Sequence, residues 1–108
     1  MPSSKLYTAL TTAALLCVAL PAQADLALAD KSTCLNCHDM DKKMVGPAFK
    51  AIAAKYAKRD DGQAYLAEKI TKGGTGVWGA IPMPGMAYLP PADISTLAKW
   101  IMTIPTPQ

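Results

Sequence analysis

Apolar residues recur at three- and four-residue intervals in several segments of this chain, and that spacing predicts amphipathic helices. No segment shows the strict alternation of apolar and polar positions that is typical of a half-buried strand. We therefore expect an all-α fold of about four helices. The predicted helices cover residues 25–33, 48–58, 63–72 and 92–103.

The apolar face of each predicted helix gives the candidate core. Asp25 is placed to cap the first helix, Pro47 suits the first turn of the second, and Gly73 with Gly74 ends the third. The first helix has Leu26, Leu28, Ala29 and Leu35 as its apolar members. The expected apolar faces of the other helices are Phe49, Ile52, Ala53 and Tyr56, then Tyr65, Leu66 and Ile70, and finally Leu97, Trp100, Ile101 and Ile104.

Residues 77–91 contain four prolines and are expected to be irregular. So long a loop in so small a domain needs a reason, and lining one face of a flat prosthetic group is sufficient.

The start of the chain has the features of an export signal. Lys5 precedes an apolar run over residues 9–20, Pro21 breaks that run, and residues 22–24 form a small-x-small cleavage site. We expect residues 1–24 to be a secretory signal peptide that is cleaved before Asp25, although the same run would also suit an uncleaved membrane anchor. Residues 25–108 then form one domain in the periplasm, and Cys17 is lost with the signal.

Composition narrows the possible partners. The net charge of the chain is +3, and this balance does not suggest binding to nucleic acid or to a membrane surface. A chain this short also struggles to bury enough apolar surface by itself, so a prosthetic group in the middle of the core would help it to fold.

The strongest chemical signal is the sequence Cys-Leu-Asn-Cys-His at positions 34–38. Cys-x-x-Cys-His is the attachment signature of a c-type haem. Two thiols at this spacing lie on the same side of a helical turn, where each can add to a vinyl group of one porphyrin. The imidazole of His38 then lies under the ring and can bind the iron. We therefore predict one haem c that is attached through Cys34 and Cys37.

Three other interpretations of this pentad are possible. A structural zinc site needs four ligands, and the chain has no other histidine and only Cys17 as a further cysteine. A thioredoxin-like redox pair needs a βαβ setting that the pattern does not predict. A simple disulfide between Cys34 and Cys37 would close a very small loop and would leave His38 without a role.

The second axial ligand must be sought among the methionines, because His38 is the only histidine. Met40 and Met44 follow His38 too closely to reach the opposite face, and Met102 suits the core of the last helix. Met83 is held between Pro82 and Pro84, which restrict the backbone on both sides of the sulfur. Met83 is the preferred ligand, with Met86 or a five-coordinate iron as alternatives.

This ligand set bears on function. Iron that is bound by two protein side chains has no open position for oxygen, peroxide or nitrite, but it can still exchange an electron through an exposed haem edge. The residues thus favour an electron carrier over an enzyme.

The chain resembles the small bacterial class I cytochromes c of the cytochrome c-551 (cytochrome c8) type. The matching segments, which span nearly all of residues 25–108, are residues 34–38, residues 44–50 (Met-Val-Gly-Pro-Ala-Phe-Lys), residues 76–84 (Gly-Val-Trp-Gly-Ala-Ile-Pro-Met-Pro) and residues 97–100 (Leu-Ala-Lys-Trp). The resemblance implies that the Pro47 carbonyl accepts a hydrogen bond from the His38 ring. It also implies that Trp78 donates to a haem propionate and that Lys69 lies near one. For Trp78 a plain core aromatic, and for Lys69 a solvated helix face, are the competing interpretations.

The chain departs from the family pattern at two places. Ala29 stands where relatives often carry an aromatic residue against the last helix, so Trp100 must find other neighbours. The loop after Met83 carries Gly85 and Met86, where the subfamily often has a second proline and an asparagine.

The expected function is that of a monomeric, soluble periplasmic shuttle. It would receive electrons from a membrane cytochrome complex or a dehydrogenase and pass them to a terminal reductase or oxidase. Contact would occur near Cys34 and Cys37, where Leu35, Lys42 and Lys43 surround the haem edge. The alternative is a haem subunit of a larger periplasmic oxidoreductase, or a protein that reacts with peroxide or a small gas.

Overall fold

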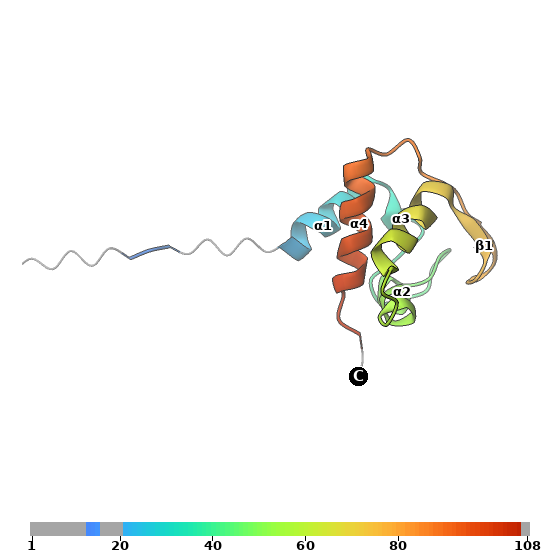
Figure 1. Ribbon diagram of the computed structural model, residues 1–108, viewed down its shortest axis with the longest axis horizontal. Coiled ribbons are helices and arrows are strands. Elements are labelled where there is room, and N and C mark those ends of the chain that lie inside the picture. The colour runs from blue at the N-terminus through green and yellow to red at the C-terminus, as the bar shows by residue number, and fades with distance from the viewer. Residues whose placement is uncertain (1–12, 16–20, 107–108) are drawn as a thin grey trace, which may run out of the picture.

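The computed structural model describes residues 13–15 and 21–106 of the chain. Within these residues it contains four α-helices, one short 3₁₀ helix and one hairpin (Figure 1), which confirms the predicted all-α class. The elements are α1 (Pro21–Lys31), the 3₁₀ helix η1 (Cys34–Asn36), α2 (Phe49–Tyr56), α3 (Gly62–Lys72), β1 (Gly74–Gly76), β2 (Gly79–Met83) and α4 (Pro91–Thr103).

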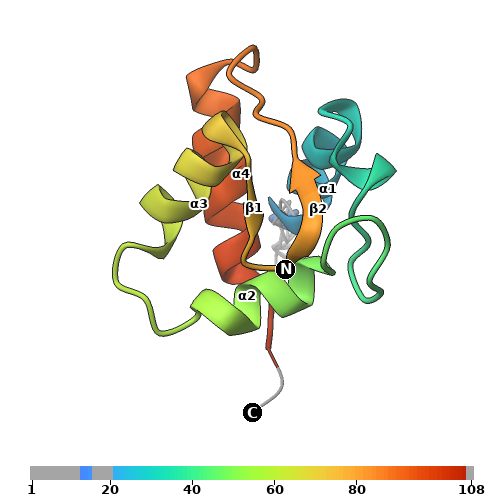
Figure 2. The same ribbon diagram turned by 90° about the vertical axis from the view of Figure 1, so that its right-hand side faces the viewer.

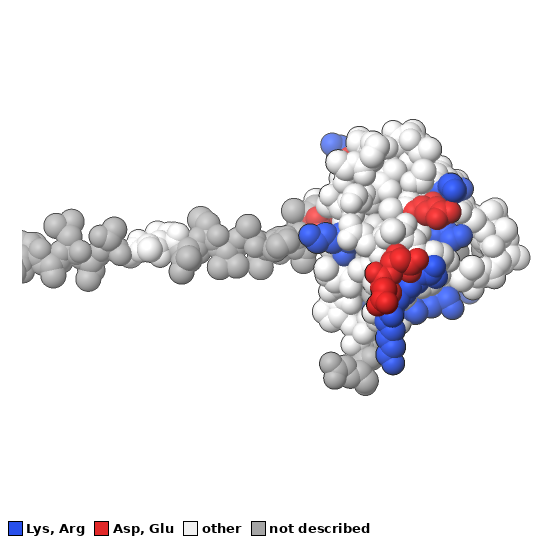
Figure 3. Space-filling model, viewed as in Figure 1, with Lys and Arg blue, Asp and Glu red and all other residues white. Residues whose placement is uncertain are grey.

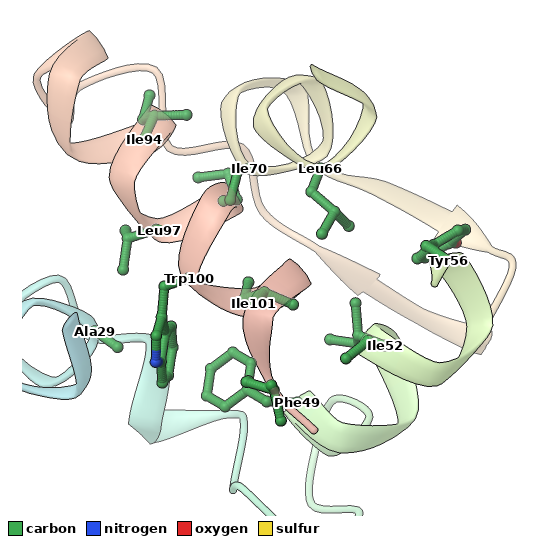
Figure 4. Packing of buried hydrophobic residues seen from close by; sticks show 13 residues of the cluster. Ala29, Phe49, Ile52, Tyr56, Leu66, Ile70, Ile94, Leu97, Trp100 and Ile101 are labelled. Atoms are coloured by element: carbon green, nitrogen blue, oxygen red, sulfur yellow. The ribbon is translucent and has the colours of Figure 1, made fainter. Parts of the chain in front are cut away.

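Helix α4 is the central element of the fold, because α1, α2 and α3 all pack against it. Pro91 occupies its first turn, where the missing N–H of proline costs nothing. The predicted apolar stripe of this helix is buried and meets side chains from the other helices (Figure 4). Its buried members are Ile94, Leu97, Ala98, Trp100 and Ile101, and Ile104 follows them.

Helices α1 and α4 contact each other, and each of them buries a small side chain completely. Ala29 and Ala98 are both 0% exposed, and side chains of this size allow two helices to approach closely. Trp100 finds its aromatic neighbour elsewhere, since its ring meets Phe49 edge-on at 5.1 Å between centroids. Leu26, an apolar member of the first predicted helix, is 36% exposed.

Helix boundaries differ from the predicted ones by a few residues. Helix α1 begins at Pro21, so Asp25 lies inside it and does not cap it; the first helix was placed too late. The expected signal peptide over residues 1–24 lies largely outside the described residues. Helix α2 begins at Phe49 because Ala48 is still extended, with φ −60° and ψ 145°, and Pro47 therefore precedes the helix.

The hairpin corrects the prediction that the glycine- and proline-rich region contains no strand. β1 and β2 pair antiparallel, with Gly74 opposite Met83 and Gly76 opposite Gly79. Nearly every residue of the hairpin is exposed, so no alternation of buried and exposed positions marks it in the sequence. Gly76 and Gly79 have φ of 100° and 118° and allow the chain to reverse between the strands. Figure 2 shows the hairpin facing the viewer, with α3 beside it and α2 below it.

Surface charge is mixed where the structure shows it. On the face seen in Figure 3, acidic and basic side chains lie beside one another instead of forming separate fields. Among the described residues, no helix is both long enough and apolar enough to cross a membrane.

Candidate functional site

A cavity of about 270 Å³ lies between α2, α3, the hairpin and the segment that carries the pentad. Most of its lining is apolar and comes from the core faces of α2, α3 and α4, including Phe49, Ile52, Leu66, Ile70, Leu97, Trp100 and Ile101. Cys34, Cys37, His38 and Met83 all line the same cavity, so the fold brings the four predicted haem-binding side chains together.

The pentad forms a tight turn. The backbone N–H groups of Cys37 and His38 both donate to the carbonyl oxygen of Cys34, at 3.2 and 2.9 Å. Both thiols are free and half-buried, so the structure holds no disulfide between them. Burial raises the pKa of the Cys34 thiol above its usual range. Across the described residues, no three His, Cys, Asp or Glu side chains converge on a point that could hold a metal ion such as structural zinc.

The imidazole of His38 is fixed on three sides. Its Nδ1 donates a hydrogen bond of 2.7 Å to the carbonyl oxygen of Pro47, as the family resemblance implied. Its ring stacks on Phe49 with 5.1 Å between centroids and 27° between planes. Gly46 passes so close that a Cβ there would lie 2.5 Å from Cε1 of His38. Because Nδ1 is already used, Nε2 is the nitrogen that remains for a metal.

The loop that carries Pro47 is tied back to the pentad by backbone hydrogen bonds. The N–H of Gly46 donates to the Cys37 carbonyl at 2.8 Å, and that of Phe49 donates to the Asp39 carbonyl at 2.9 Å. The Asp39 carboxylate accepts the N–H groups of Asp41 and Lys42, and these bonds lower the pKa of Asp39. The position of the His38 ring therefore follows from local bonding of the chain around it.

Two of the methionines line the cavity. Met83, at the end of β2, and Met86, in the loop that follows, are both half-buried and contribute to the lining. Met40, Met44 and Met102 do not line it. The cavity lining therefore leaves Met83 and Met86 as candidate thioether ligands, and these are the two that the sequence favoured.

Trp78 and Lys69 both line the cavity, and each lies next to a tyrosine ring. Trp78 lies at the turn of the hairpin, is 40% exposed and meets Tyr56 edge-on at 6.5 Å. The ammonium group of Lys69 lies 5.3 Å from the centre of the Tyr65 ring. Their roles toward a propionate stay predictions.

The two tyrosines are cavity residues that sequence reasoning did not single out as part of a site. The hydroxyl groups of Tyr56 and Tyr65 lie 3.5 Å apart, and the guanidinium of Arg59 lies 3.9 Å from the centre of the Tyr65 ring. Burial, together with the neighbouring Tyr65 hydroxyl, raises the pKa of Tyr56 to about 12. A pair formed across two helices leaves no pattern along the chain, so the sequence carried no signal for it.

The lining residues fit a covalently attached haem. An apolar cavity suits a porphyrin, two free thiols on one turn suit its vinyl groups, and a fixed imidazole with one free nitrogen suits its iron. A thioether on β2 is available as a further ligand.

Comparison with known proteins agrees with this site. The family model described as Cytochrome c matches residues 26–105. The chain is 53% identical over 92 residues to cytochrome c-552 of Nitrosomonas europaea, which covers 85% of this chain and 89% of that protein. It is 46% identical over 96 residues to cytochrome c-551 of Allochromatium vinosum, which covers 89% and 96% of the two chains. The crystal structure of wild-type Nitrosomonas europaea cytochrome c552 superimposes with a TM-score of 0.72 at 51% identity, covering 74% of this chain and 99% of that one.

A protein with this fold and cavity is a c-type haem protein. The chain belongs to the cytochrome c family, as a small class I member that holds one covalently attached haem c. Its relatives are electron carriers, and no family of enzymes is indicated.

Proposed function

We propose that this chain is a soluble periplasmic electron carrier whose haem c is held by Cys34 and Cys37 and ligated by His38 and Met83. The observation that carries the proposal is that His38 and Met83 line one apolar cavity together while the Pro47 carbonyl occupies the other ring nitrogen of His38. A haem c bound there supplies a one-electron Fe(III)/Fe(II) couple.

The chain's own residues suit a carrier. His38 and Met83 would both bind the iron, which would leave no position open for a substrate. Phe49 stacks on the imidazole, and the apolar side chains of α2, α3 and α4 would keep water away from a bound iron. A site that is held this rigidly needs little rearrangement when the charge changes.

The edge of the cavity offers a surface for brief encounters. Val45 is 51% exposed and Ile81 is 65% exposed, and both line the cavity mouth. Lys42 and Lys43 are exposed, and Lys43 lines the same cavity. A small apolar patch next to scattered lysines suits weak contact with redox proteins. The proposed donor is a membrane cytochrome complex or a dehydrogenase, the proposed acceptor is a terminal reductase or oxidase, and the carrier is a monomer.

The first test is an absorption spectrum of the exported protein in both oxidation states. We expect a low-spin spectrum with the far-red band that marks methionine bound to ferric haem. Met83→Ala should lose that band. Met44→Ala should keep it, because Met44 is 48% exposed and does not line the cavity. Met86→Leu should keep it as well, and this variant separates the two cavity methionines.

The opposite results are equally informative. A high-spin wild type, or one that binds carbon monoxide readily, would have an open iron position, and the carrier would give way to a catalyst or a gas sensor. Loss of the band in Met86→Leu but not in Met83→Ala would assign the ligand to Met86. The mass of the exported protein tests whether the signal peptide is removed, because the proposed cleavage makes Asp25 the first residue.

A further inference from the structure

The segment between α2 and α3 ends in Asp61-Gly62, the one place in the sequence where glycine follows an aspartate or an asparagine. Such a pair is chemically labile, because glycine has no side chain to shield its backbone nitrogen. The Gly62 nitrogen can attack Cγ of a protonated Asp61 carboxyl group. A carbon–nitrogen bond forms, the carboxyl OH leaves as water with the amide hydrogen, and a cyclic succinimide results. Water then opens this ring at either carbonyl group and leaves aspartate or isoaspartate.

The peptide unit between Asp61 and Gly62 is held in an orientation that opposes this reaction. At the Asp61 ψ of 18° the Gly62 nitrogen lies near the Asp61 nitrogen, whereas the ring needs it near Cβ. The unit must therefore turn about the Cα–C bond of Asp61. Its N–H donates to the Arg59 carbonyl at 3.1 Å, and its carbonyl accepts from the Tyr65 N–H at 2.8 Å. Both hydrogen bonds must break before the unit can turn.

Packing holds the same peptide unit. Gly62 is a buried residue of the first turn of α3. The terminal methyl group of Met102, on α4, lies 2.5 Å from the position that a Cβ on Gly62 would take. The attacking nitrogen thus belongs to a residue that is covered by a neighbouring helix, and movement of this residue disturbs the contact between α3 and α4.

The carboxylate that would be attacked is bound by the guanidinium group of Arg59. Nε of Arg59 donates to Oδ1 of Asp61, and a terminal nitrogen donates to Oδ2 at 3.2 Å. This two-point contact needs the planar fork of an arginine. It lowers the pKa of Asp61 and so disfavours the protonated carboxyl group that loses OH. The guanidinium carbon of Arg59 in turn lies 3.9 Å from the centre of the Tyr65 ring.

We propose that Asp61-Gly62 is the site at which this chain forms isoaspartate, and that Arg59 keeps the site closed in the folded protein. Arg59 binds both reacting groups, because its carbonyl oxygen accepts the N–H of the attacking nitrogen and its guanidinium group holds the carboxylate. Isoaspartate would lengthen the backbone by one carbon directly before α3, whose Leu66 and Ile70 line the cavity. The proposal does not depend on which side chains bind the iron.

The test stores three exported holoproteins side by side at neutral pH: the wild type, Arg59→Ala and Lys58→Ala. Lys58 is the matched control, because it is exposed and carries the same charge one position away. Isoaspartate is counted by enzymatic methylation with an isoaspartyl methyltransferase and is located by fragmentation of the peptides in a mass spectrometer. We expect Arg59→Ala to form isoaspartate at position 61 about three times faster than the wild type, the factor typical of losing an exposed ion pair. Lys58→Ala should match the wild type.

Two further samples separate the contribution of the fold from that of Arg59. The wild type stored in guanidinium chloride has lost both hydrogen bonds and the ion pair, and it should form isoaspartate at position 61 faster than any of the folded samples. Arg59→Lys serves if Arg59→Ala does not fold. Lysine keeps the charge but cannot bind both carboxylate oxygens through one planar group, so this variant should also form isoaspartate faster than the wild type.

Three outcomes would overturn the proposal. Equal rates in the wild type and in the folded Arg59 variants would show that Arg59 does not protect the site, and an equal effect of Lys58→Ala would reduce the role of Arg59 to general charge. Equal rates in the folded and the denatured wild type would show that the fold does not close the site. Isoaspartate at another aspartate of the denatured chain, with none at position 61, would show that the site lies elsewhere.

Discussion

Gly46 lies flat against the imidazole ring of His38. A Cβ on Gly46 would lie 2.5 Å from Cε1, 2.9 Å from Nδ1 and 3.1 Å from Nε2 of that ring, so there is no room for a side chain between residue 46 and the imidazole. Phe49 stacks against the same imidazole at 5.1 Å, and the Pro47 carbonyl holds Nδ1. Gly46 therefore supports the imidazole that we propose as the iron ligand.

Gly46→Ala should displace the His38 ring. We expect the holoprotein to lose about 1–3 kcal/mol of unfolding free energy, the range typical of forcing an extra methyl group into a packed site. Denaturant unfolding followed by circular dichroism measures this loss. Gly74→Ala is the control, because a Cβ at that position has room. Equal stability of Gly46→Ala and the wild type would show that the ring is free to move away from residue 46.

Thr33, immediately before Cys34, has φ 66° and ψ 10° and is the one described non-glycine residue with positive φ. A β-branched residue is costly in this left-handed conformation, whereas asparagine tolerates it. Thr33→Asn should therefore raise the unfolding free energy by about 1 kcal/mol. The measurement is denaturant unfolding of the holoprotein. Thr75→Asn, on β1, should bring no gain, and a gain of equal size there would remove the backbone explanation.

The sequence was most informative about features that depend on residues close together in the chain, namely the haem-attachment motif and the amphipathic helices. The pentad at residues 34–38 predicted a covalently attached haem. Cys34, Cys37 and His38 all line the cavity, as that prediction requires. The spacing of Phe49 and Tyr56 predicted a buried face on α2, and both are buried. Such patterns are visible along the sequence because the residues on one face of a helix recur every three or four positions.

Features that depend on distant backbone contacts could not be predicted in this way. The hairpin is held by hydrogen bonds between exposed, glycine-rich strands, so it lacks the alternation that marks a strand. The sequence does not predict the positive φ of Thr33, because threonine rarely adopts this conformation. The closeness of Gly85 to the end of α3 depends on how two segments meet, and nothing along the chain records it.

Removal of the haem should leave a chain without fixed tertiary structure. A cavity of about 270 Å³ is lined by core side chains of α2, α3 and α4 and by the hairpin. At about 24 cal/mol per Å³, leaving such a volume unfilled costs roughly 6 kcal/mol, which is comparable to the whole stability of a small domain. The double variant Cys34→Ala/Cys37→Ala, which has no thiol for attachment, should lose its near-ultraviolet circular dichroism and its cooperative unfolding. A cooperative thermal transition in this variant, with no haem in its spectrum, would show that the helices pack without the cofactor.

Tyr56 should make the protein sensitive to alkaline pH in a defined window. Burial raises its pKa to about 12, against about 10 for an exposed tyrosine. Below pH 10 the phenol is protonated in both the folded and the unfolded chain and has no effect on the pH dependence. Between pH 10 and 12 the unfolded chain releases this proton and the folded chain keeps it. The free energy of unfolding should therefore fall with rising pH, by at most about 1.4 kcal/mol per pH unit from this group.

Tyr56→Phe separates this effect from the titration of other groups. The variant loses the Tyr65 hydroxyl contact but keeps the ring, so its unfolding free energy should fall less steeply than that of the wild type between pH 10 and 12. An ultraviolet titration should show a late tyrosinate phase in the wild type that is missing from Tyr56→Phe. Tyr88→Phe is the control, because its ring is 72% exposed and the late phase should persist without it. If the late phase survived in Tyr56→Phe, the high pKa would belong to another tyrosine, and the buried Tyr56–Tyr65 pair would not explain the loss of stability at high pH.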